Sequence, residues 1–406
     1  MVAERASHHP LPRPPHTSDA EVIVVGGGPA GAAVAIHLAR RGRRVILLEG
    51  RTLARARASE MRSGEVLSPG GQAELNRLGL PTANADWRYD SFATLRNRWP
   101  DGRVTIDRLP RGLAYWQTDR GRLDRALFAL AGAAGAACHD GQRVRELLRD
   151  AAGAVCGVLT GDSSGTGQPW RAPIVVDASG RYSAIVVQLD LKRPDPEFRR
   201  AAMVTFYGDM SDCPPHVWEQ HFLGRHGTAL KGGRMAPALY RFSLETDLAA
   251  RDRYAATLGN AAPRELTLAI LRDLAPHLHE RLRAATALPH STAYAPLAYR
   301  LRRVVGDGLL LVGDAAGYLD PGTGQGIEFA LRTARVAAET IERALVLGDY
   351  RAERFAPYVA GRHREIARAM AWLRLYLRLT RHSRLLGAVS RVPLARAGMI
   401  RAMVRG

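Results

Sequence analysis

A glycine-rich turn near the start of the chain has the residue types and spacing of a dinucleotide-binding site. The apolar run at residues 22–25 is followed by three glycines in the pattern G-x-G-x-x-G, and residues 30–41 are predicted to form a helix. Glycine permits a tight turn, close approach of the backbone to a pyrophosphate, and close packing of helix on strand. The helix amino terminus also offers free N–H groups to phosphates. The predicted cofactor contacts are Gly26, Gly28, Pro29, Ala30 and Gly31.

A second predicted strand, residues 44–49, is apolar at 45–48 and ends in an acidic residue, Glu49. At this position a carboxylate accepts hydrogen bonds from the ribose hydroxyls of an adenosine and repels a 2′-phosphate. FAD or NAD is therefore favoured over NADP. A strand-to-helix turn that binds no nucleotide is the alternative. It is disfavoured because the strand, the helix and the acid all occur at the spacing of a dinucleotide site.

A second strand, acid, turn and helix follow at residues 308–331. This segment resembles the second flavin-binding segment of FAD-dependent monooxygenases of the para-hydroxybenzoate hydroxylase type, including the related geranylgeranyl-reductase and flavin-halogenase branch. The resemblance implies that Asp314 binds the ribityl O3′ and that the helix beginning near Gly324 points its amino terminus at flavin N1 and O2. A helix-capping aspartate is the alternative for Asp314. The cofactor contacts implied here are Gly313, Asp314, Pro321, Gly324, Gly326 and Ile327.

Three further segments resemble the same family, and all five occur in its order over residues 21–345. The resemblance makes Arg62 a pyrophosphate partner, places Arg120 at the start of a helix beside the cofactor, and places Asp177 near FAD and the nicotinamide donor. The family usually has Asp-Gly where this chain has Asp177-Ala178, which leaves the role of Asp177 open. Arg62 as a solvated surface residue and Asp177 as a turn residue are the alternatives.

The resemblance implies an α/β fold with a Rossmann-like FAD-binding domain of the three-layer, glutathione reductase-like type. A mixed β-sheet substrate domain and a basic helical tail complete the expected architecture. The expected divisions are a disordered leader at 1–20; a discontinuous FAD-binding domain at 21–90, 111–190 and 291–345; a substrate-binding domain at 91–110 and 191–290; and a basic helical C-terminal region at 346–406.

Composition is consistent with a large cytoplasmic enzyme. The 406 residues are 46% hydrophobic, enough for two packed cores. Cys138, Cys156 and Cys213 have no paired spacing, which argues against disulfides or a zinc site. The first twenty residues do not have the apolar core of a secretory signal, and no run reaches the ~18 apolar residues of a membrane span.

The net charge of +19 is concentrated in the tail, because residues 351–406 contain 13 arginines and two glutamates. Trp372, Leu375, Tyr376 and Leu379 fall at helical spacing among these arginines. We expect this apolar stripe to pack on the catalytic body. Docking of an acidic carrier or an anionic membrane surface is the alternative. Nucleic-acid binding is disfavoured because no recognised module is present.

Residues 191–290 depart from the nucleotide-binding pattern. Strands are predicted at residues 201–207 and 238–244, helix over most of 248–288, and short strands near 94–97 and 104–107. The resemblance implies a mixed sheet that roofs the substrate pocket. The polar residues expected in the pocket are Tyr207, His221, Tyr240 and Arg241, with structural roles as the alternative. His216, His221 and His226 do not share a helical face, so no metal site is expected.

The favoured reaction is oxygenation of a hydrophobic or aromatic small molecule by FAD, O2 and NAD(P)H, in bacterial secondary metabolism. No second G-x-G-x-x-G follows a strand, so NAD(P)H is expected to bind transiently, and no protein catalytic residue is named. A flavin halogenase is disfavoured because no lysine precedes Lys192 and the W-x-W-x-I-P signature is absent. A reductase of the geranylgeranyl type, supported by the turn at residues 321–326, and a tailoring flavoenzyme acting on a carrier- or peptide-bound substrate remain alternatives.

Overall fold

The structure, a computed structural model, describes residues 18–53, 64–83, 85–161, 167–318 and 321–405. Residues 1–17 of the expected leader lie outside the described residues. Its last residues belong to the folded body, because Asp19 exchanges hydrogen bonds with the backbone of Arg171 and Ala20 is buried. Residues 19–20 therefore belong to the folded body and not to a disordered leader.

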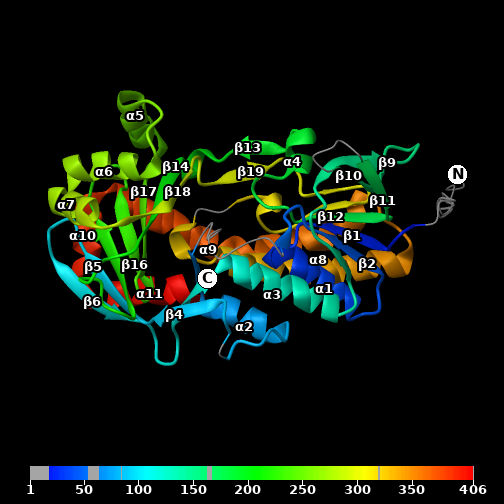
Figure 1. Ribbon diagram of the computed structural model, residues 1–406, viewed down its shortest axis with the longest axis horizontal. Coiled ribbons are helices and arrows are strands. Elements are labelled where there is room, and N and C mark those ends of the chain that lie inside the picture. The colour runs from blue at the N-terminus through cyan, green and yellow to red at the C-terminus, as the bar shows by residue number, and fades with distance from the viewer. Residues whose placement is uncertain (1–17, 54–63, 84, 162–166, 319–320, 406) are drawn as a thin grey trace, which may run out of the picture.

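A six-stranded sheet, parallel except at one edge, forms the centre of the domain that is expected to bind FAD (Figure 1). Its central strands are short apolar runs buried on both faces, as is typical of parallel sheets. The strand order is β20 (Val305–Gly306), β21 (Leu309–Leu311), β12 (Ile174–Asp177), β1 (Val22–Val25), β2 (Val45–Leu48) and β8 (Ala137–His139).

Alternating side chains of β1 hold the layers on either side of this sheet together. Val22 and Val24 face a helical layer, whereas Ile23 and Val25 face an antiparallel three-stranded sheet. This arrangement confirms the predicted three-layer fold. The helices are α1 (Pro29–Ala39), α3 (Arg120–Ala133) and α8 (Gly326–Leu347); the strands are β9 (Val144–Arg149), β10 (Val155–Gly161) and β11 (Gly167–Arg171).

Smaller elements lie between this sheet and a second large sheet. One is a three-stranded sheet with α2 beside it, and another is a two-stranded ribbon. Their bounds are β3 (Gly64–Leu67), β7 (Tyr115–Asp119), β4 (Arg88–Phe92), α2 (Pro69–Arg77), β13 (Lys192–Pro194), β19 (Tyr299–Leu301), α4 (Ala184–Gln188) and the 3-10 turns η3 (Pro196–Phe198), η4 (Gly313–Ala316) and η5 (Pro321–Thr323).

A mixed seven-stranded sheet forms the other end of the molecule (Figure 1). The strand order is β18 (Ala287–Tyr294), β14 (Arg200–Tyr207), β17 (Leu239–Asp247), β16 (Ala229–Ala236), β15 (Val217–Phe222), β5 (Thr94–Arg98) and β6 (Val104–Arg108). Helices cover one face of this sheet, and the opposite face is turned toward the six-stranded sheet. The helices are α5 (Leu248–Leu258), α6 (Pro263–Leu274) and α7 (Pro276–Ala284); Gly259, Pro263 and Pro276 divide the predicted helical stretch.

The C-terminal region connects the two ends of the molecule. After η6 (Ala352–Phe355), it forms α9 (Ala356–Arg381), α10 (Ser383–Arg391) and α11 (Pro393–Arg405). Tyr376 and Leu379 of the predicted stripe are buried against the seven-stranded sheet, whereas Leu375 is half exposed. Several of the arginines pair with acids of the body, such as Arg374 with Glu197, Arg391 with Asp101 and Arg396 with Asp107. In the described part of the chain, no helix combines the length and apolarity needed to cross a membrane.

Candidate functional site

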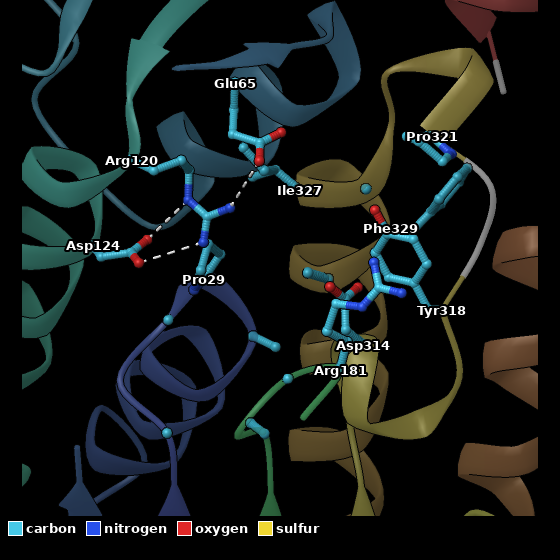
Figure 2. Close-up of a pocket in the computed structure, with 18 of the residues that line it drawn as sticks. Pro29, Glu65, Arg120, Asp124, Arg181, Asp314, Tyr318, Pro321, Ile327 and Phe329 are labelled. Atoms are coloured by element: carbon cyan, nitrogen blue, oxygen red, sulfur yellow. Dashed lines mark hydrogen bonds and ion pairs between the residues drawn. The ribbon is translucent and has the colours of Figure 1, made fainter. Parts of the chain in front are cut away.

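A cavity of about 910 Å³ extends from the turn after β1 to the open face of the seven-stranded sheet. Every predicted segment that the structure describes contributes to its wall or lies directly beneath it. Figure 2 shows Pro29, Arg120, Asp314, Pro321 and Ile327 around part of this cavity.

The three glycines after β1 are required for different reasons. Gly26 has φ +101°, and an added Cβ would lie 2.6 Å from the carbonyl oxygen of Ala178. A Cβ on Gly31 would lie 1.9 Å from the carbonyl oxygen of Gly26, so this contact fixes the packing of α1 on the turn. Gly28 lines the cavity, and a Cβ there would meet no atom within 4 Å. The first two glycines therefore shape the turn, and Gly28 keeps space open in the cavity.

Helix α1 presents an uncapped amino terminus to this space. The helix begins at Pro29, its N-cap is Gly28, and no side chain caps it. Free N–H groups at a helix start, with the positive end of the dipole, suit phosphate oxygens.

Glu49 forms an ordered carboxylate at the edge of the cavity. Its Oε2 accepts a hydrogen bond from the Gly27 N–H, and its Oε1 accepts from the Arg51 backbone N–H and from Arg51 Nε. Burial by itself raises the pKa of Glu49, but the hydrogen bonds and charge of Arg51 lower this pKa overall. The carboxylate is therefore ionised at neutral pH and can accept hydrogen bonds.

Arg120 stands between two acidic residues at the start of α3. Its Nε lies 3.1 Å from Asp124 Oδ1, and its Nη1 lies 3.8 Å from Glu65 Oε1 (Figure 2). These contacts orient the guanidinium along the cavity wall. Arg62 lies outside the described residues, so its assignment as a phosphate partner stays a prediction.

Asp177 does not line the cavity. Its Oδ1 accepts hydrogen bonds from the backbone N–H and the hydroxyl of Ser179, and its Oδ2 accepts from the hydroxyl of Ser183. The following residues, including Ala178 and Arg181, form the wall instead. The structure thus places Asp177 beneath this loop, as in the alternative of a turn residue, because both carboxylate oxygens are engaged within the turn.

Asp314 lines the cavity opposite Arg120. Burial raises the pKa of Asp314 to about 6, and the charge of Arg120 opposes that shift. Arg181 points toward the same region, with its guanidinium 4.4 Å from the Tyr318 ring centroid (Figure 2). A carboxyl group that is partly protonated near neutral pH can accept a hydrogen bond from a sugar-alcohol hydroxyl or donate one to it.

Helix α8 presents a second uncapped amino terminus. Pro321, Gly324, Gly326 and Ile327 line the cavity around its start. Its N-cap residue is Gln325, which makes no side-chain cap; the side chain is fully buried, and neither amide atom has a hydrogen-bond partner among the described residues. Gln325 was not predicted from the sequence, although it lies between the predicted contacts Gly324 and Gly326.

These features fit an FAD molecule. Two open helix amino termini face one cavity, the space beside Gly28 is free, and Glu49 and Asp314 supply carboxyl groups at separate points. Among the described residues no group of three potential metal ligands occurs.

Strand alternation separates the four predicted substrate contacts. Successive side chains of a strand point to opposite faces. Arg241 lines the cavity, whereas its neighbour Tyr240 and also Tyr207 are buried in the core beneath α6 and α7. His221 likewise alternates with the cavity residue Gln220 and contacts Glu219 at 3.4 Å. Tyr207, His221 and Tyr240 are therefore not placed as predicted; only Arg241 reaches the cavity.

The cavity face of the sheet contains residues that sequence reasoning did not select. They are Trp218, Gln220, Lys231, Ser243 and Glu245. Ser243 and Glu245 follow Arg241 at the two-residue spacing of one strand face, so that face could have been extended from Arg241. Lys231 is one of only two lysines in the chain, and it interrupts an apolar strand.

Comparisons with known proteins agree with this geometry. Residues 19–372 match the family described as FAD binding domain. The chain is 30% identical over 393 residues to a 6-methylpretetramide 4-monooxygenase of Streptomyces rimosus, covering 87% of this chain and 82% of the relative. It is 24% identical to a 1H-pyrrole-2-carbonyl-(peptidyl-carrier protein) chlorinase of Pseudomonas fluorescens, covering 89% and 84%. A geranylgeranyl bacteriochlorophyll reductase-like structure from Thermoplasma acidophilum superposes with a TM-score of 0.77 at 19% identity, covering 96% and 95%.

Proposed function

Because the chain belongs to the FAD binding domain family and is an FAD-dependent oxidoreductase, we propose that it is a monooxygenase that uses NAD(P)H and O2. Its reaction hydroxylates or epoxidises a hydrophobic or aromatic substrate in bacterial secondary metabolism. The observation that supports this most directly is the single cavity joining the predicted FAD contacts to the open face of the seven-stranded sheet. The relative named as a monooxygenase supports the same reading.

Different residues of the cavity are assigned to the cofactor and to the substrate. Gly28 and the start of α1 would hold the pyrophosphate of FAD, Glu49 would accept hydrogen bonds from its ribose, and Asp314 would bind its ribityl chain. Phe92, Leu95, Ala202, Val204 and Trp218 form an apolar wall on the substrate side. This wall excludes water and holds a ring or hydrocarbon. Bound FAD would supply electron transfer from NAD(P)H to O2 and transfer of one oxygen atom to the substrate.

Isotope labelling tests the proposal. Purified protein with FAD, NADH or NADPH and a panel of phenolic and other aromatic compounds is incubated under ¹⁸O2. The expected result is substrate-stimulated consumption of NAD(P)H and O2, with one labelled oxygen atom in the product. Reduction of a carbon–carbon double bond under anaerobic conditions would instead support the reductase alternative, and a product that forms only with added halide would support halogenation.

A carrier-bound substrate is the second candidate. It is favoured by the relative whose printed name refers to a peptidyl-carrier protein and by exposed apolar residues on the basic C-terminal helices, including Leu385 and Leu394. An acidic carrier docked on these helices would bind less tightly as salt screens the arginines. If the affinity for an acyl carrier protein does not change with salt, this candidate is contradicted. Binding of the protein to anionic lipid vesicles, without binding to the carrier protein, would also contradict it.

A further inference from the structure

A second, smaller cavity lies between the seven-stranded sheet and the C-terminal helices. Its volume is about 50 Å³. Leu95, Gln220 and Met403 belong to its wall and also to the wall of the large cavity. The two spaces are therefore neighbours, separated by side chains that both of them share.

Two rows of side chains on β5 and β15 pass from the large cavity into the small one. Residues two apart on a strand share a face, and these two strands are paired in parallel. Trp218 lines the large cavity, whereas Trp99 and Phe222 line the small one, where their rings stack with centroids 5.0 Å apart. One sheet face thus forms the floor of both cavities. The rows are Leu95, Asn97 and Trp99 on and just after β5, and Trp218, Gln220 and Phe222 on β15.

Helix α11 covers this floor with flexible apolar side chains. Met399, Ile400 and Met403 line the small cavity from one face of the helix, and Trp372 of α9 lines it as well. Methionine is unbranched and adapts its shape to neighbouring groups. Because Met403 borders both spaces, a change in its side-chain rotamer can open a passage between them.

The charged groups of the small cavity bind one another. Asp107 Oδ1 accepts a hydrogen bond of 3.1 Å from Arg396 Nε. Asp107 Oδ2 accepts one of 2.9 Å from Asn97 Nδ2 and one of 2.8 Å from Thr105 Oγ1. Both carboxylate oxygens are engaged, and the arginine is paired. A ligand in this cavity therefore meets a mainly apolar wall.

The volume limits what the small cavity can receive. A water molecule takes up about 30 Å³ in the liquid, and a methylene group is of similar size, so this space holds about two carbon atoms. We propose that it receives a short alkyl arm of the substrate, attached to the ring that lies against Trp218. With a carbon atom at the partition beside Met403, the arm has about three carbon atoms. This inference rests on the proposed function in treating the bound ring compound as the substrate.

Binding of 4-alkylphenols, from phenol to 4-hexylphenol, to the oxidised FAD-containing protein tests this inference. Perturbation of the flavin absorbance reports binding. Affinity should rise about fourfold with each methylene group that enters the apolar wall, since burial of one such group is worth about 0.8 kcal/mol. The rise should end near 4-propylphenol, because the cavity is then full. A flat series, a steady rise through 4-hexylphenol, or no binding by any member would overturn the inference.

Variants of Met399 assign the length limit to the small cavity, because Met399 lines this cavity and not the large one. Met399→Ala should extend the rise to longer arms, whereas Met399→Phe should end it at a shorter arm. Leu394→Phe is the matched control, since it adds the same ring to the same helix at a side chain that is 80% exposed. Its series should equal that of wild type. An unchanged length limit in both Met399 variants would overturn the assignment.

Wild-type protein alone also decides the question if a variant does not fold, since the end of the rise is measured without it. Tyr376 also lines the small cavity and brings a hydroxyl group to its wall. Tighter binding of 3-(4-hydroxyphenyl)propan-1-ol than of 4-propylphenol would therefore replace the apolar arm with one that ends in a polar group. These measurements contain no NAD(P)H and need no O2. Failure of the inference is therefore distinguishable from failure of the monooxygenase proposal, which the labelling experiment tests separately.

Discussion

Glu49 Oε2 accepts a hydrogen bond of 2.8 Å from the backbone N–H of Gly27. This contact ties the acid at the end of β2 to the glycine turn that follows β1. The residue predicted to contact ribose therefore also holds the turn predicted to contact phosphate.

Glu49→Gln should weaken FAD binding at least about tenfold, because an amide places an N–H group against one of the donors that the carboxylate satisfies. The change in FAD affinity is measured by monitoring the fluorescence of FAD as it is released. Glu146→Gln is the control, since Glu146 is exposed on β9. Equal FAD affinity in Glu49→Gln and wild type would show that Glu49 does not serve the cofactor.

Gly28→Val should fold and lose FAD. The φ of Gly28 is −74°, which valine tolerates, and its side chain would enter the open space of the cavity. Gly31→Ala is the contrasting variant, because its Cβ would collide with the Gly26 carbonyl and prevent folding. Circular dichroism and the flavin absorbance of the purified proteins separate the two effects. A yellow Gly28→Val protein would contradict the placement of the pyrophosphate.

The carboxyl group of Asp314 should make stability depend on pH in the FAD-free protein. Burial raises its pKa to about 6 from the ordinary value of 3.8, so the folded state holds this proton more tightly than the unfolded state. The stabilisation is complete below about pH 4 and is lost as pH rises through about 6, by about 1–3 kcal/mol. Chemical unfolding of wild type and Asp314→Asn at several pH values measures it. The free energy of unfolding of Asp314→Asn should lack this decrease with pH. If it depends on pH in the same way as that of wild type, Asp314 is not the group responsible.

Helix α11 should shield the cavity from solvent. Met403 lines the cavity, and its carbonyl oxygen accepts a hydrogen bond of 3.1 Å from the Tyr115 hydroxyl. Deletion of residues 393–406 should therefore increase quenching of flavin fluorescence by iodide. Leu394→Ala is the control, because this side chain is 80% exposed. Unchanged quenching after the deletion would show that α11 does not cover the flavin.

Local sequence determined the FAD half of this protein. Gly26, Gly31 and Glu49 stand within thirty residues of one another, and their requirements concern one turn and the strands beside it. The family, the fold class and the flavin enzyme class were predictable for this reason and are confirmed. Arg120 and Asp314 also line the cavity, since Arg120 directly follows β7 and Asp314 lies in the turn η4 that follows β21.

Tertiary structure alone decided the substrate half. The strands around Tyr207, His221 and Tyr240 are buried on both faces, so their composition does not show which face meets the cavity. That choice follows from where α6 and α7 pack. Lys231, Arg200 and Glu245 come together only because β14, β16 and β17 pair side by side. A turn depends on neighbouring residues, whereas the exposed face of a sheet depends on which distant elements cover the other face.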